Sequence, residues 1–214
     1  MFYDALKGDH GLPHDPINAL VSPRPIGWIS SLSKSGVRNL APYSYFNLVA
    51  GMPPIVMFGS AFVKDSQRNI EETGEFVCNL ATWELREAVN ASSAPAPPEV
   101  DEFALVGLDG APSTLVRPPR IKQAVAALEC TYLQTIPLPS ATAEPHFFSM
   151  VLGLVVGVYI DEAVITDGLV DVTRIKPLSR LGYMDFAVVQ EVFAMERPSY
   201  PRTAVQVAPQ PAAT

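Results

Sequence analysis

The stretch that decides the fold is residues 22–47, SPRPIGWISSLSKSGVRNLAPYSYFN. Within it, PIGWISSL at residues 25–32 is short and apolar, as expected of a strand. Residues 34–36, Lys-Ser-Gly, then supply the small and polar side chains of a turn. A second strand is expected at about residues 39–49, so the stretch predicts an antiparallel hairpin.

The rest of the chain continues as apolar segments of strand length. Further strands are expected at residues 55–62, 76–81, 128–136 and 147–160. The helices between them are few and short, and the regular alternation of strand and helix that marks a doubly wound sheet is missing. This pattern predicts a mainly β fold, a barrel with short helical insertions.

One helix is well marked, in DSQRNIEETG at residues 65–74. Asp65 or Ser66 is expected to cap its first turn. Gly74 stands where a glycine commonly ends a helix. The sequence therefore predicts where this helix begins and ends.

Polar residues around the start of that helix form a candidate anion site. Ser60 closes the preceding strand, and Lys64 follows a short loop. Ser66 and Asn69 are three residues apart and share one face of the first turn. Free amides at a helix start, with a hydroxyl and an ammonium nearby, make a good receptor for a terminal phosphate. On these residues alone, a capped surface helix beside a solvated lysine is the simpler interpretation.

The composition is that of an ordinary globular chain. Its 214 residues are 48% apolar and 17% charged, which predicts one domain over residues 1–196. Residues 197–214 are rich in proline and alanine and are expected to form a disordered tail. The net charge of −7 argues against nucleic acid as a partner, because binding a phosphate backbone requires a basic surface.

Three features predict a cytoplasmic location without membrane attachment. Cys78 and Cys130 are too few for a disulfide framework and suit a reducing compartment. The N-terminal residues lack the basic and apolar regions of a secretory signal. The longest apolar run, residues 147–160, is too short to span a bilayer.

Motifs for other chemistries are missing or weak. The chain has no G-x-G-x-x-G after a predicted strand and no G-x-S-x-G, which disfavours a Rossmann site and a hydrolase elbow. His10 and His14 are spaced like a helical ligand pair, but a glycine and a proline lie between them. His146 is remote in sequence. We therefore expect no metal site, and we assign no residue a catalytic role.

Several segments together resemble the flavin reductase-like, FMN-binding split-barrel family, over about residues 18–195. They are residues 22–47, PPIVMF at 53–58, KDSQRNIEETGEFVCNL at 64–80, VDEFALVGL at 100–108, ALEC at 127–130 and RIKPLSRLGYMDFAVV at 174–189. The resemblance implies a six-stranded antiparallel split barrel with short helical insertions. It also implies a homodimer, with one FMN near each subunit contact.

The resemblance further implies how the cofactor is held. The phosphate of FMN should be bound by the candidate anion site, Ser60, Lys64, Ser66 and Asn69. The isoalloxazine should be lined, partly through backbone groups, by Asn39, Ala41, Pro42, Ser44 and Tyr45. A strand of this composition offers a stiff apolar wall, with amides that meet the polar edge of the ring.

Other residues in the matched segments have two interpretations. Tyr43 and Phe46 fit an ordinary barrel core as well as a flavin wall. Ser30 and Ser31 are weaker candidates for contacts to the ring or the ribityl chain. Arg180 fits either a contact to the cofactor or partner subunit or a surface salt bridge.

The implied function is that of an FMN-dependent oxidoreductase. NADH or NADPH would supply hydride, and the reduced flavin would pass electrons to a small-molecule acceptor or to a partner oxygenase. The alternative is an FMN-binding electron carrier or flavin-handling protein without nicotinamide activity. The sequence does not discriminate between the two, because such barrels bind nicotinamide by stacking it on the flavin.

Overall fold

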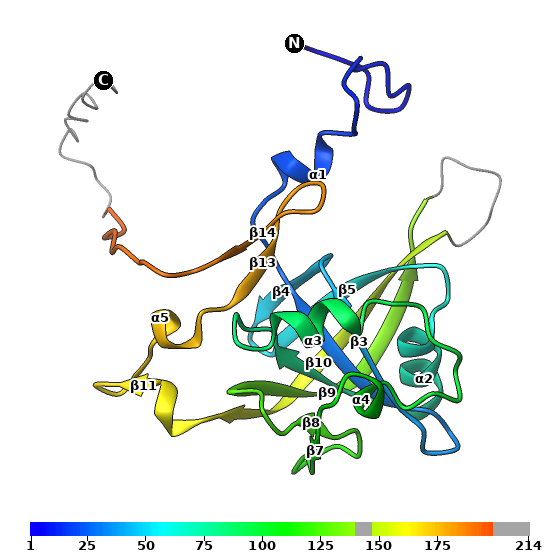
Figure 1. The fold of residues 1–214 in the computed structure, drawn as a ribbon, viewed down its shortest axis with the longest axis vertical. Helices are drawn as coiled ribbons and strands as arrows, with labels where there is room; N and C mark the ends of the chain where they lie inside the picture. The colour runs from blue at the N-terminus through cyan, green and yellow to red at the C-terminus, as the bar shows by residue number, and fades with distance from the viewer. Residues whose placement is uncertain (140–146, 199–214) are drawn as a thin grey trace.

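The computed structural model describes residues 1–139 and 147–198, and its main sheet has seven antiparallel strands (Figure 1). In spatial order they are β3-β2-β6-β9-β10-β5-β4. Their bounds are Gly27–Leu32 (β2), Arg38–Tyr43 (β3), Phe46–Gly51 (β4), Pro54–Ala61 (β5), Glu75–Leu80 (β6), Ala126–Pro137 (β9) and Phe148–Ile160 (β10). The mainly β architecture is confirmed, but this sheet has one strand more than the six expected.

The additional strand results from a bend at Ser44 and Tyr45. The sequence predicts one strand over about residues 39–49, and the structure corrects this to β3 and β4, separated by these two residues. β3 pairs with β2, whereas β4 pairs with β5 at the opposite edge of the sheet. Two strands that are consecutive in the chain thus form the two edges, so the sheet has to curl. Within residues 1–139 and 147–198, no ladder of hydrogen bonds joins β3 to β4, and the barrel is split.

The predicted hairpin is confirmed, with Gly27 opposite Tyr43 and Leu32 opposite Arg38. Successive side chains of a strand point to opposite faces, so β2 contributes to two apolar clusters. Trp28 belongs to a cluster with α3 and α4, and its neighbour in the chain, Ile29, belongs to a cluster inside the curled sheet.

Short helices and strands are inserted between the main strands, as expected (Figure 1). The helices are α1 (Ile17–Leu20), α2 (Asp65–Thr73), α3 (Arg86–Ala91), α4 (Glu102–Leu105), the 3-10 helix η1 (Glu162–Val164) and α5 (Val172–Ile175). The short strands are β1 (Arg24–Pro25), β7 (Gly110–Ala111), β8 (Arg120–Ile121), β11 (Ile165–Thr166), β12 (Leu169–Val170), β13 (Leu178–Arg180) and β14 (Phe186–Val188). None of the helices in the described part of the chain has the length and apolar character needed to cross a membrane.

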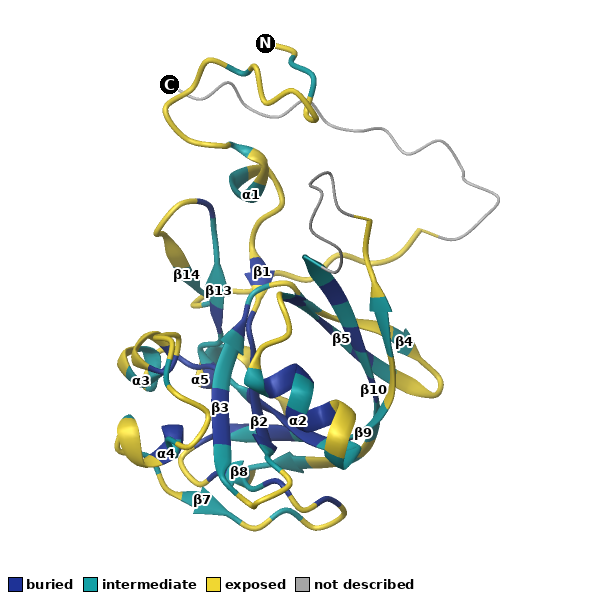
Figure 2. Ribbon diagram, turned by 90° about the vertical axis from the view of Figure 1, so that its right-hand side faces the viewer, coloured by how far each residue is buried: buried dark blue, intermediate teal, exposed yellow. Residues whose placement is uncertain are grey.

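The helix α2 packs on β2 and β3 (Figure 2). Its buried side is mostly polar, since Ser66, Gln67 and Asn69 are buried together with Ile70. The helix ends at Gly74, whose φ of 79° is left-handed, so the predicted C-terminus is confirmed. A polar face pressed onto a sheet requires hydrogen-bond partners, and Ser66 and Asn69 find theirs on the two strands at the candidate site.

The expected tail is described only in part. Residues 189–198 contain no helix or strand. Residues 199–214 and His146 lie outside the described residues, so the predictions made for them stay predictions.

Candidate functional site

A cavity of about 600 Å³ lies along the outer edge of β3. Five of the predicted cofactor residues line it: Asn39, Ala41, Pro42, Lys64 and Ser66. The opposite side is formed by residues 92–96, which follow α3, and by Glu102 of α4. A cavity of this volume accommodates a small molecule.

The first turn of α2 opens onto this cavity. Lys64 is the last extended residue, with ψ of 171°, so the helix begins at Asp65. The prediction that Asp65 or Ser66 caps the helix is therefore wrong, because both residues already lie inside it. No side chain of the described residues caps the helix. The amides of its first turn are left for water or a ligand, and their partial positive charge favours an anion.

Lys64 and Asp65 both line the cavity beside this helix start, and their charges are opposite in sign. Asp65 is paired with Arg68 on the next turn, which offsets its negative charge. Lys64 has no ion-pair partner within residues 1–139 and 147–198, and its Nζ lies 5.9 Å from the centre of the Tyr43 ring. One uncompensated ammonium and the free amides therefore face the same end of the cavity.

Tyr43 belongs to both the core and the cavity. Its ring packs on Phe58 with a centroid distance of 4.6 Å, and it also lines the cavity. Burial raises the pKa of its hydroxyl, and the nearby hydroxyls of Ser66 and Ser60 lower it by less. The hydroxyl is buried without a hydrogen-bond partner among the described residues. The phenol is thus a protonated donor held behind the cavity wall, beside Ser66 and Ser60.

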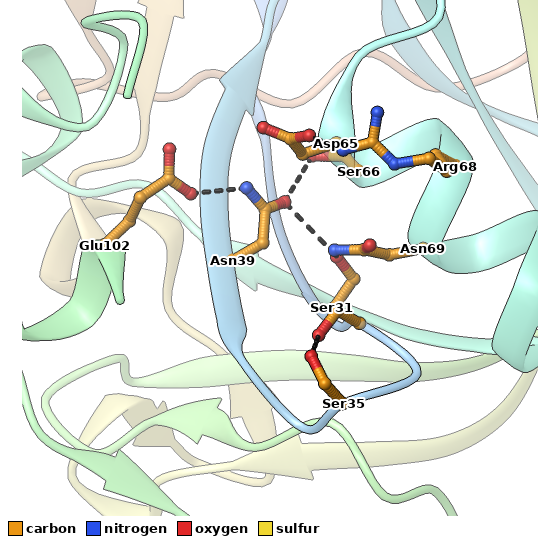
Figure 3. A network of polar contacts seen from close by, with 9 residues as sticks. Ser31, Ser35, Asn39, Asp65, Ser66, Arg68, Asn69 and Glu102 are labelled. Atoms are coloured by element: carbon orange, nitrogen blue, oxygen red, sulfur yellow. Dashed lines mark hydrogen bonds and ion pairs between the residues drawn. The ribbon is translucent and has the colours of Figure 1, made fainter. Parts of the chain in front are cut away.

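The side-chain amide of Asn39 connects the helix to the strands (Figure 3). Its Oδ1 accepts hydrogen bonds from Ser66 Oγ at 2.7 Å and from Ser31 Oγ at 3.2 Å. Its Nδ2 donates to Glu102 Oε2 at 2.5 Å. One buried amide thus links β2, β3, α2 and α4, and it fixes the wall of the cavity.

Glu102 closes part of the exposed edge of β3. Its Oε2 also accepts from the backbone N–H of Leu40 at 2.6 Å. The pKa of this carboxyl is raised, chiefly by burial and to a lesser extent by the negative charge of Asp101. The hydrogen bonds from the Leu40 amide and from Asn39 lower the pKa, but by less than it is raised. The next outward-facing residue along the edge is Pro42, which has no N–H. The edge facing the cavity therefore offers carbonyl oxygens and an apolar ring.

The other predicted cofactor residues lie outside this cavity. Ser60 is fully buried and its Oγ donates to the Phe62 carbonyl at 3.0 Å. Asn69 is buried and its Nδ2 donates to Ser31 Oγ at 3.3 Å. Both are thus engaged within the protein. Ser44 and Tyr45 line neighbouring cavities at the bend after β3.

The sequence does not assign Glu102 or residues 92–96 to the site, and it leaves Tyr43 open between barrel core and flavin wall. The strand pattern indicates Tyr43 as well. It lies two residues after Ala41 and four after Asn39, so all three side chains point to the same face of the strand. Glu102 lies more than 60 residues from Asn39 in the chain, and no local pattern reveals their contact.

Comparison with known proteins identifies the family. The family model described as "Flavin reductase like domain" matches residues 20–177. This chain belongs to the flavin reductase-like family. A protein of Halalkalibacterium halodurans is 34% identical over 184 residues, which are 84% of this chain and 88% of the relative.

Two solved structures are similar in both sequence and fold. Nitrilotriacetate monooxygenase component B from Bacillus cereus is 32% identical with a TM-score of 0.79, covering 84% of this chain and 90% of the other. The 2-nitrobenzoate 2-nitroreductase of Pseudomonas fluorescens is 30% identical with a TM-score of 0.77, covering 88% and 91%. The flavin reductase-like split-barrel fold is therefore shown.

The raised pKa of Glu102 predicts a pH dependence of stability. The folded protein holds this proton to higher pH than the unfolded chain, so ionisation of Glu102 lowers the free energy of unfolding as the pH rises through the raised pKa. Glu102→Gln removes this titration. Urea unfolding at about pH 4, 5.5 and 7 should show wild type losing stability relative to the variant as the pH rises. The exposed Glu99→Gln is the control. Parallel curves for wild type and Glu102→Gln would contradict the assignment.

Proposed function

We propose that the protein is an FMN-binding oxidoreductase with flavin reductase-like activity, and that NADH or NADPH is its electron donor. One observation carries the proposal: the uncapped start of α2 opens onto one end of the cavity along β3, which Lys64 and Tyr43 also line. That end combines amide, ammonium and hydroxyl donors, as a phosphate monoester requires. FMN ends in such a group, and the chain belongs to a flavin reductase-like family.

The phosphate end of the proposed site is formed by Lys64, Ser66 and Tyr43. Ser66 reaches the cavity while its hydroxyl donates to Asn39, which leaves its oxygen lone pairs as acceptors and its backbone N–H as a donor. Ser60 and Asn69 are proposed to act one layer behind, where Ser60 lies beside Tyr43 and Asn69 supports Ser31.

The ring end of the proposed site follows β3 toward the bend. Asn39, Ala41 and Pro42 would line the isoalloxazine first, and Ser44 and Tyr45 would line it where the chain turns away. Carbonyl oxygens on the outward edge suit a ring N–H, and the proline ring provides an apolar surface without a competing donor.

The chain's own contribution to the reaction is orientation and electrostatics. Bound FMN supplies the hydride and electron transfer. Lys64 and the α2 amides offset the charge of the phosphate, and the network around Asn39 keeps the wall rigid. No side chain is proposed as a general acid or base.

Lys64→Glu tests the phosphate end. The change removes a cation and brings an anion toward the phosphate, so the affinity of the apoprotein for FMN should fall by about 100-fold or more. Riboflavin lacks the phosphate, and its affinity should change by less than about threefold. Titration calorimetry with both flavins measures this difference. Lys122→Glu makes the same charge change at an exposed site elsewhere. Unchanged FMN affinity would remove Lys64 from the site.

The reaction is tested by the visible absorption spectrum of the FMN-loaded protein under anaerobic conditions. Addition of NADH or NADPH should bleach the flavin absorption. A flavin that persists after both donors but bleaches with dithionite would contradict the reductase proposal and leave the electron-carrier function. A protein that stays colourless after incubation with FMN would contradict the cofactor assignment itself.

Three further expectations stay predictions. A homodimer is supported by large exposed apolar side chains on β4, β9 and β10, namely Leu48, Val49, Leu133 and Val158. Transfer of reduced flavin to a partner oxygenase is supported by the similarity to a monooxygenase component B. The cytoplasmic location still rests on the sequence alone.

A further inference from the structure

A second cavity, of about 490 Å³, opens at the bend between β3 and β4. Ser44 and Tyr45 contribute one side, and the segment leading into α1 and the turn between β13 and β14 contribute the others. The last two walls are packed tightly together, because a Cβ at Gly182 in the turn would lie 2.5 Å from the Cβ of Ala19 in α1. Two of the walls of the cavity are therefore in direct contact with each other.

Arg24 brings a buried positive charge to this cavity. The residue is only 8% exposed. Its guanidinium donates to the carbonyl oxygens of Asn18 and Val21, each at 2.5 Å, and of Leu181 at 2.9 Å. Its Nε is buried without a hydrogen-bond partner among the described residues, and none of their carboxylates pairs with it. A buried cation with only neutral acceptors retains its attraction for an anion.

Arg180 adds a second guanidinium to the same cavity. It donates to the carbonyl oxygens of Tyr183 and Met184 and lies over the Phe186 ring, and no carboxylate of residues 1–139 and 147–198 pairs with it. Asp15 is the single carboxylate among the described residues that line the cavity, and its Oδ1 accepts from the Ile17 amide. The cavity thus has an excess of positive charge on a chain whose net charge is −7.

This cavity is linked to the proposed flavin site by lining residues that neighbouring cavities share. A third cavity of about 340 Å³ lies between them and shares Ser44, Arg180 and Met184 with the arginine cavity. It shares Pro42 and Ser93 with the cavity along β3. A molecule bound at Arg24 and Arg180 would therefore lie next to the ring end of the flavin site and away from the phosphate end.

We propose that the arginine cavity binds the anionic group of the small molecule that exchanges electrons with the flavin, with Arg24 and Arg180 as its cationic ligands. The inference rests on the proposed function, because it requires a flavin along β3. Tyr45 and Tyr183 supply aromatic surfaces for a planar ring next to the anionic group. The anion is either a phosphate of a nicotinamide dinucleotide or the carboxylate of an aromatic acceptor. Both are recognised by guanidinium groups through charged hydrogen bonds.

Arg180→Gln tests the inference in the FMN-loaded protein. Glutamine keeps a donor for the Tyr183 carbonyl but removes the charge, whereas Arg24 also clamps three backbone carbonyls and is less suited to replacement. Anaerobic stopped-flow bleaching gives the dissociation constant for NADH and for the uncharged 1-benzyl-1,4-dihydronicotinamide. Titration calorimetry gives the dissociation constant for benzoate, and this measurement does not depend on turnover. Arg174→Gln, which removes an exposed arginine of α5, is the control.

The variant should weaken binding of an anionic probe by about tenfold, and of the uncharged donor by less than about twofold. Weakening of NADH alone identifies the dinucleotide phosphate, and weakening of benzoate alone identifies an aromatic carboxylate. Three results would overturn the inference. The variant could weaken charged and uncharged probes equally, or it could leave the binding of both anions unchanged. Alternatively, wild-type protein could take up FMN but bind neither anion. Wild-type protein that takes up no FMN would instead overturn the proposed function.

Discussion

The side-chain amide of Asn39 is the contact on which the rest of the site depends. Its oxygen accepts from Ser66 and Ser31, and its nitrogen donates to Glu102, so one group holds α2 and α4 to the edge of the sheet. Because the amide is buried and satisfied on both sides, loss of either partner would leave a polar group without compensation. This constraint keeps the start of α2 beside β3 and thereby creates the end of the cavity that suits a phosphate.

The bend at Ser44 and Tyr45 decides where the cavities lie. It places β3 and β4 at opposite edges of one sheet, so that the outward edge of β3 is left without a pairing strand. The free N–H and C=O groups of such an edge have to be covered by other parts of the chain or bound by a ligand. Glu102 covers it at Leu40, and beyond that point Pro42 and Ser44 line a series of neighbouring cavities, of which the last is lined by Arg24. The proposed cofactor site and the arginine cavity thus both lie along this edge and its continuation into the bend.

The sequence predicts those features that local chemistry decides. The hairpin follows from a turn between two apolar runs, and the end of α2 follows from Gly74. The residue that precedes the first turn of α2 is not predicted correctly. Asp65 and Ser66 are residue types that commonly cap a helix, but the last extended residue is Lys64 and both already lie inside the helix. The bend after Tyr43 was missed because the apolar pattern continues through it, and only pairing with β5 on the far edge divides the strand.

We propose that the donors at the start of α2, together with the Tyr43 hydroxyl, hold the phosphate of FMN. A crystal structure of the protein grown with FMN tests it most directly. The phosphate should lie within hydrogen-bonding distance of Lys64 Nζ, the Ser66 amide and the Tyr43 hydroxyl, with the ring along β3 toward Ser44. A phosphate bound elsewhere, or a flavin along β3 in the reverse direction with the Tyr43 hydroxyl still unpartnered, would contradict this assignment.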